Sequence, residues 1–214
     1  MINADLAAMR QNYSQSELDE STVSADPFGQ FAAWMNDVLK AEIKEPTAMT
    51  LATVGPGDIP SSRVVLLKGF DAEGLVFFTN YESLKGRELA ANPNAVIHFF
   101  WPELERQVNV RGVVTRLSAD ESDEYFNSRP FESRIGAWAS QQSEKIDSRQ
   151  VLENRVAELL EKYADGNVPR PPFWGGYRLQ PDRFEFWQGR ESRLHDRICY
   201  DLKGTEWVIS RLAP

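Results

Sequence analysis

Apolar residues recur at helical spacing near the start of the chain. Phe28, Phe31, Met35 and Val38 fall on one face of a helix, so this period of three to four residues predicts an amphipathic helix over 27–43. Asp26-Pro27 supplies an N-cap and a first-turn proline. Three further helices are predicted at 84–91, 118–128 and 148–163, the second of them opened by a capping box.

The pattern after residue 47 is typical of strands. β-Branched and aromatic residues occur in short runs, separated by turn sequences such as Gly55-Pro56-Gly57-Asp58 and Lys203-Gly204. Their close succession favours an α+β fold in which an antiparallel β-barrel carries peripheral helices, and it does not resemble the alternating units of a dinucleotide fold. The predicted strands are 47–54, 59–69, 75–79, 95–101, 105–117, 177–179, 183–188, 193–202 and 207–212.

The first 25 residues are polar and rich in serine and acids. We expect residues 1–25 to form a flexible N-terminal arm and residues 26–214 to form a single domain. The opening sequence is not typical of a signal peptide, and no apolar run approaches the roughly 20 residues of a membrane helix. The expectation is a cytoplasmic protein.

Charge limits the possible partners. The 214 residues include 24 Lys+Arg and 32 Asp+Glu, a net charge of −8, which argues against binding to nucleic acid or to an anionic membrane. Any anionic ligand must therefore meet a local cluster of cations. The one cysteine, Cys199, excludes a disulfide framework; it is predicted to be a core residue, as is His98, with a hydrogen bond. No group of residues has the spacing of a metal site.

Four groups could bind an anion. Arg193, His195 and Arg197 would share one face of a strand, although a solvated edge strand is the alternative. Arg63 and Lys68 would lie on opposite faces of another strand and could serve two different anions, unless each flanks the strand end in water.

The other two groups lie on helices. Lys85 follows Ser83 at a helix N-terminus, where free N–H groups favour phosphate, but short helices often begin this way without a ligand. Tyr125 and Arg129 are four residues apart on one helix face, with Ser133 beyond; alone they could be a surface pair.

Taken together, the ordered motifs resemble the pyridoxamine 5′-phosphate oxidase family, from about residue 10 to the C-terminus. The chain departs from many relatives at Phe78, where tyrosine is common, and at Leu84, where arginine is. The motifs are RVVLLK (63–68), ERQV (105–108), YFNSRP (125–130), IGAWASQQS (135–143), FWGGY (173–177), EFWQG (185–189), RLHDR (193–197) and RLAP (211–214).

The resemblance implies a split β-barrel homodimer with FMN at the subunit interface. It implies an oxidase that converts pyridoxamine 5′-phosphate and pyridoxine 5′-phosphate to pyridoxal 5′-phosphate in vitamin B6 metabolism, with O2 as acceptor and H2O2 as product. The residues that match the flavin contacts are Arg63, Val64, Val65, Leu66, Leu67, Lys68, Phe78, Thr79, Lys85, Gln107, Gln142, Ser143, Trp187 and Arg197.

For the substrate, the resemblance implies a phosphate pocket, a pair of catalytic residues over the pyridine ring and an arm that closes over it. These are Lys68, Tyr125, Arg129 and Ser133 for the phosphate, Arg193 and His195 for the ring, and Arg10 and Tyr13 for the arm. Two alternatives stay open: another split-barrel flavoenzyme with a different substrate, and a non-catalytic protein that binds flavin or pyridoxal phosphate.

Overall fold

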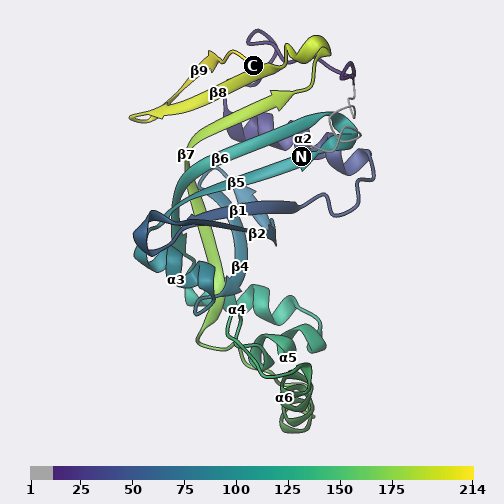
Figure 1. Ribbon diagram of the computed structural model, residues 1–214, viewed down its shortest axis with the longest axis vertical. Coiled ribbons are helices and arrows are strands. Elements are labelled where there is room, and N and C mark those ends of the chain that lie inside the picture. Colours follow the sequence, from purple (N-terminus) through teal and green to yellow (C-terminus); the bar gives the residue numbers. More distant parts are fainter. Residues whose placement is uncertain (1–11) are drawn as a thin grey trace, which may run out of the picture. The chain divides into compact units, whose positions relative to one another are not determined.

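The computed structural model describes residues 12–214 and divides into two compact units. The terminal unit contains the chain up to Met49, Ile97–Arg111 and Asp182–Pro214, and the central unit contains Thr50–Val96 and Gly112–Pro181. Three strands pass through both units: β5 (Asn94–Trp101), β6 (Arg106–Arg116) and β7 (Trp174–Gln188) (Figure 1).

The central unit is built on a sheet in the order β2-β1-β5-β6-β7-β4-β3. Its other strands are β1 (Ala48–Val54), β2 (Pro60–Leu66), β3 (Gly69–Asp71) and β4 (Gly74–Asn80), and its helices are α3 (Leu84–Ala91), α4 (Ala119–Ser128), α5 (Phe131–Ala139) and α6 (Arg149–Lys162). Leu51, Leu75 and Phe77 are fully buried in it. β4 pairs antiparallel with both β3 and β7.

The terminal unit contains α2 (Pro27–Lys40) and the hairpin of β8 (Asp196–Lys203) and β9 (Glu206–Arg211), which is yellow in Figure 1. Asp26 caps α2 by accepting the N–H of Gly29 at 2.9 Å. The apolar face of α2 packs on strand residues, with the Phe31 and Phe99 ring centroids 5.2 Å apart. β8 pairs antiparallel with β7 and β9.

The structure confirms the α+β split-barrel class, the four predicted helices and the final hairpin turn. It corrects three details. α5 was not predicted, the strands expected at 177–179 and 183–188 are one strand, and the strand expected from 193 begins only at Asp196. In the described part of the chain, no helix has both the length and the apolar character needed to cross a bilayer.

Candidate functional site

A cationic cavity of about 500 Å³ opens in the central unit. Its walls come from the end of β2, from β4, from the start of α3, from the α4–α5 junction and from the first residue of β7. Three cations and no carboxylate line it, so its chemistry suits an anion. The lining residues are Val64, Val65, Leu66, Lys68, Phe78, Thr79, Lys85, Tyr125, Arg129, Pro130, Ser133, Gln142 and Trp174.

Lys85 lies in the first turn of α3, where Ser83 is the N-cap. Its side chain is buried, and its Nζ donates to Oε1 of Gln142 at 2.9 Å and to Oγ1 of Thr79 at 3.3 Å. Burial lowers the pKa of Lys85 to about 8, and the charge of Arg63 lowers it further while Glu88 opposes the shift. An ammonium held mainly by neutral acceptors in this way favours an incoming anion.

Arg129 is the second buried cation of the cavity. Its Nη1 is buried and has no hydrogen-bond partner among the described residues. The guanidinium lies 4.6 Å from the ring centroid of Trp174, and burial lowers the pKa of Arg129. Because a buried donor without an acceptor costs free energy, Arg129 is poised for an anionic ligand.

Three stacked rings form one wall of the cavity. Phe78 and Tyr125 lie 3.8 Å apart with an interplanar angle of 19°, and Trp174 stacks on Phe78 at 5.6 Å. Phe78 stands where many relatives have tyrosine and brings no hydroxyl to this wall. The stack fixes Tyr125 and gives Arg129 the flat surface of Trp174.

Arg63 does not line the cavity, in contrast to the prediction that Arg63 and Lys68 serve separate anions from opposite faces of a strand. β2 ends at Leu66, so strand alternation does not extend to Lys68, which is exposed and lines the cavity. Arg63 Nη2 instead forms an ion pair with Glu88 Oε2 at 3.2 Å.

Glu88 is the centre of this second polar cluster. It accepts hydrogen bonds from Thr53 Oγ1 at 2.5 Å and from Ser61 Oγ at 2.7 Å. Burial alone would raise the pKa of Glu88, but the two hydroxyls and Arg63 outweigh it and lower the pKa. The cluster therefore stabilises the fold through an ionised carboxylate.

We expect Glu88→Gln to lower the free energy of unfolding by about 2 kcal/mol at pH 7, because it leaves Arg63 without its counter-charge. A carboxylate with a lowered folded pKa contributes stability above its unfolded pKa of about 4.3, and this contribution is lost as pH falls through the lower folded value. Urea titrations at pH 7 and pH 3 should show a smaller acid loss in Glu88→Gln than in the parent. Glu153→Gln, in the exposed Arg149–Glu153 pair, is the control and should change stability by less than about 0.5 kcal/mol.

The terminal unit places His195 directly after a sharp turn rather than on a strand. Glu191–Arg193 form a 3-10 turn in which Ser192 and Arg193 have left-handed backbones, with φ of 55° and 63°. Arg193, His195 and Arg197 therefore do not share one strand face, and that prediction is wrong. The turn exposes Arg193, which forms no ion pair with any described residue; such backbone strain is typical of functional sites.

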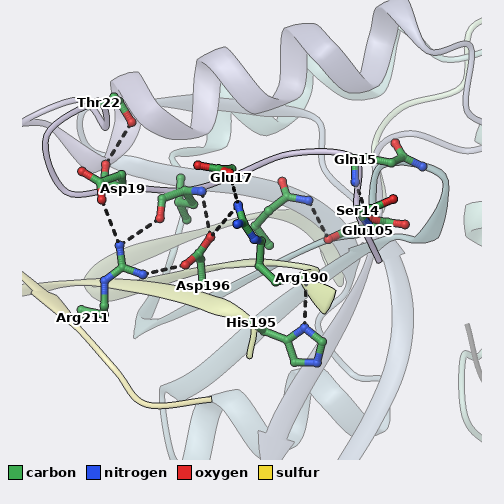
Figure 2. Close-up of polar contacts among 12 residues, drawn as sticks. Ser14, Gln15, Glu17, Asp19, Thr22, Glu105, Arg190, His195, Asp196 and Arg211 are labelled. Atoms are coloured by element: carbon green, nitrogen blue, oxygen red, sulfur yellow. Dashed lines mark hydrogen bonds and ion pairs between the residues drawn. The ribbon is translucent and has the colours of Figure 1, made fainter. Parts of the chain in front are cut away.

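His195 is oriented by its neighbours. Its Nδ1 accepts the backbone N–H of Arg190 at 3.1 Å (Figure 2), which assigns the proton of the neutral ring to Nε2. Burial, followed by the charge of Arg193, lowers the pKa of His195, and Asp196 opposes the shift. Its ring centroid is 4.6 Å from that of Trp187 and 5.7 Å from that of Tyr13. His195 therefore offers an N–H donor at neutral pH.

The remaining predicted residues divide between the two units. Arg197 pairs with Glu185 through Nη2 at 2.7 Å and is the register partner of Trp187. Gln107 lies half-buried on β6 in the terminal unit. In the central unit, Ser143 has a φ of 77° in the turn after Gln142, Leu67 is buried beyond the end of β2, and neither lines the cavity. Arg10 lies outside the described residues.

Sequence reasoning missed Trp174 and Pro130 as lining residues. Trp174 is part of the quoted FWGGY motif, but its position at the start of β7 gave no sign of a role. Cys199 is fully buried, as predicted, and burial raises its pKa. His98 has its predicted hydrogen bond, 2.9 Å from Nδ1 to Asn109 Oδ1, but is half-buried rather than core. The described residues contain no cluster of metal-binding side chains.

Comparison with known proteins identifies the family. Residues 35–163 match the model described as pyridoxamine 5′-phosphate oxidase, and residues 174–214 match the pyridoxine 5′-phosphate oxidase C-terminal dimerisation region. The chain belongs to the pyridoxamine 5′-phosphate oxidase family. This confirms the resemblance stated from the motifs and makes the protein an oxidoreductase of the oxidase type.

Two curated family members illustrate the similarity. The pyridoxine/pyridoxamine 5′-phosphate oxidase of Gloeothece citriformis is 52% identical over 100% of both chains, and that of Burkholderia lata is 58% identical over 98% of this chain and 99% of the relative. Among solved structures, PhzG from Burkholderia lata 383, in complex with tetrahydrophenazine-1-carboxylic acid, has a TM-score of 0.87 and 32% identity over 92% of this chain and 98% of its own. A pyridoxamine 5′-phosphate oxidase-related, FMN binding protein from Nostoc punctiforme has a TM-score of 0.69 at 19% identity, covers 90% of this chain and 100% of its own, and shares the fold.

Proposed function

We propose that the protein is an FMN-dependent oxidase that converts pyridoxamine 5′-phosphate and pyridoxine 5′-phosphate to pyridoxal 5′-phosphate and acts as a homodimer. The observation that carries the proposal is the cationic cavity, which holds Lys68, Lys85 and Arg129 and no carboxylate in a chain of net charge −8. Both FMN and the substrate bring a phosphate. The match to a C-terminal dimerisation region supports the dimer.

The cavity residues suit these two phosphates. Lys85, with Thr79 and Gln142 beside its Nζ, would hold the flavin phosphate at the N-terminus of α3. Arg129, with an unpaired Nη1, would bind the substrate phosphate together with its neighbours. In this proposal the flavin residues are Arg63, Val64, Val65, Leu66, Leu67, Lys68, Phe78, Thr79, Lys85, Gln107, Gln142, Ser143, Trp187 and Arg197, and the substrate residues are Arg10, Tyr13, Lys68, Tyr125, Arg129, Ser133, Arg193 and His195.

Bound FMN would supply the redox chemistry by accepting a hydride from C4′ of the substrate and passing the electrons to O2, which leaves as H2O2. The chain's own residues bind and orient the substrate. Arg129 neutralises the phosphate, which is remote from the reacting carbon, so its binding energy serves to position C4′. Arg193 covers the pyridine ring, and His195 donates its Nε2–H to a ring substituent. Placement of this kind is worth up to about 7–11 kcal/mol of barrier in favourable cases.

A second candidate is an oxidase of a tricyclic carboxylic acid, because the PhzG structure holds tetrahydrophenazine-1-carboxylic acid. Three cations around one cavity favour a phosphate dianion over a single carboxylate. An assay of oxygen consumption separates the candidates, with pyridoxine 5′-phosphate, unphosphorylated pyridoxine and a reduced phenazine carboxylate as substrates. We expect peroxide and aldehyde with the phosphorylated vitamer alone. Equal rates with unphosphorylated pyridoxine, or turnover of the phenazine only, would contradict the proposal, and binding without oxygen uptake would indicate a carrier.

Flavin affinity is expected to fall as pH rises through about 8, since Lys85 loses its charge there. Above that pKa, binding of the phosphate requires uptake of a proton, so the affinity falls by up to about tenfold per pH unit. Fluorescence titration of the apoprotein with FMN from pH 6.5 to pH 9.5 measures this. Lys85→Met should bind more weakly at pH 7 and show a flatter profile. The same slope in both proteins would contradict the role of Lys85.

A further inference from the structure

Two carboxylates hold the backbone of residues 14–18 in the terminal unit. Glu105 Oε2 accepts the N–H of Ser14 at 2.9 Å and that of Gln15 at 3.1 Å, and Asp196 Oδ2 accepts the N–H of Leu18 at 3.1 Å. The Leu18 side chain is 5% exposed. This part of the expected arm is therefore anchored by its main chain as well as by one apolar side chain.

Two arginines complete the attachment (Figure 2). Arg211 Nε donates to Glu20 Oε1 at 2.8 Å, while its Nη1 donates to Asp196 Oδ1 at 2.7 Å and its Nη2 to the carbonyl of Leu18 at 3.0 Å. Arg190 Nη1 forms an ion pair with Glu17 at 2.9 Å. One guanidinium thus joins β9, the first residue of β8 and the segment before α2.

The anchored segment begins at Tyr13, whose ring lies beside His195 and Trp187. The Tyr13 and Trp187 centroids are 5.8 Å apart with an interplanar angle of 86°. Gly189 allows this approach, because a Cβ there would lie 2.8 Å from Cγ of Tyr13. Asp196 follows His195 directly in the chain, so the point of attachment and the proposed ring-binding residue are adjacent.

We propose that Arg211 and Asp196 are positioning residues that form a charged clasp, which holds the Tyr13–Glu20 segment against His195 and so governs how tightly the substrate is held. The kinetic part rests on the proposed function, because it requires His195 to contact the substrate. Isolated surface ion pairs contribute little. Here, however, Asp196 is 18% exposed, and Arg211 makes several bonds to one short segment. Charge complementarity supports the assignment, since Glu17, Asp19 and Glu20 face Arg190 and Arg211.

Hydrogen exchange and steady-state kinetics of the FMN-loaded enzyme test the clasp. In Arg211→Gln we expect exchange at the Leu18 amide to be at least about tenfold faster, because the fork that fixes Asp196 and Glu20 is lost. KM for pyridoxine 5′-phosphate should rise about fivefold, while kcat changes less than twofold and flavin content is unchanged. Arg211→Lys keeps the charge without the fork and should give intermediate values. Arg149→Gln, which removes an exposed pair on α6, is the matched control and should match the parent in every measurement.

Salt provides an independent check. At 1 M NaCl the Debye length falls to about 3 Å, so exchange at Leu18 should accelerate in the parent and much less in Arg211→Gln. Unchanged exchange in Arg211→Gln would overturn the clasp, and faster exchange with an unchanged KM would overturn its kinetic role. An enzyme inactive toward both vitamers would overturn the proposed function instead, while the exchange result would still decide whether the clasp exists.

Discussion

Replacing Arg193 by alanine is expected to lower kcat for pyridoxine 5′-phosphate by about a hundredfold or more while the protein keeps its flavin. Arg193 is exposed on the strained Glu191–Arg193 turn and has no ion-pair partner among the described residues. Its guanidinium is therefore free to lie over a pyridine ring. Loss of that contact misplaces the reacting carbon, and an error of about 1 Å can cost a hundredfold in rate. Stopped-flow reduction of the enzyme-bound flavin measures the step directly.

Arg193→Lys is the informative companion variant. It retains the charge but not the planar group, so we expect it to recover only a small part of the lost rate. The flavin absorbance per protein chain should be the same in the parent and in both variants. If Arg193→Ala lost flavin in proportion to activity, Arg193 would be a cofactor residue rather than a substrate residue.

Replacing Arg129 by methionine is expected to raise KM for the phosphorylated substrate by about 50-fold. A hydrogen bond to a charged group is worth about 1.5–3 kcal/mol, and each 1.4 kcal/mol is tenfold in affinity. The same change should leave the free energy of unfolding within about 1 kcal/mol of the parent, because Nη1 has no described partner to lose and only the contact with Trp174 disappears. Steady-state kinetics and thermal unfolding of the substrate-free enzyme measure the two effects.

Arg149→Met is the control for loss of an arginine, since Arg149 is exposed on α6. It should change neither KM nor stability appreciably. Rates with unphosphorylated pyridoxine give a second comparison, because they should be equally low in the parent and in Arg129→Met. A KM that did not change in Arg129→Met would contradict the placement of the phosphate beside Arg129.

Local sequence signals predicted those elements whose boundaries are set by local chemistry. The helix at 84–91 was predicted with its observed bounds because Ser83 caps one end and Asn92-Pro93 stops the other. α5 was missed although Phe131, Ile135 and Ala139 have helical spacing, because its N-cap is Pro130 and no side chain caps it.

The division of β7 into two strands was wrong for a reason that lies outside local sequence. Pro181 has no N–H and normally argues against a central strand. β7 pairs with β4 up to Leu179 and with β8 from Arg183, so Pro181 falls between two ladders. Gly112 helps, because a Cβ there would lie 2.1 Å from the carbonyl oxygen of Gln180. Only the tertiary pairing shows that a proline is tolerated at this point.

The candidate site was partly predictable. Motif order selected the residues that the structure gathers around one cavity, including Lys85, Tyr125 and Arg129. The strand-face argument for Arg193, His195 and Arg197 failed because two left-handed residues turn the chain before β8 begins. The pairing of Arg63 with Glu88 was not predictable either, since the two residues are 25 positions apart and meet only in the folded sheet.

The buried thiol has a consequence for the durability of the protein. An oxidase of the proposed kind releases peroxide beside its own side chains, and peroxide attacks thiolates that are ionised and accessible. Cys199, the only cysteine, is fully enclosed in β8, and burial raises its pKa. Met35 and Met49 are buried as well. The described part of the chain thus presents little sulfur to its own by-product, and repeated turnover should not require a reducing agent.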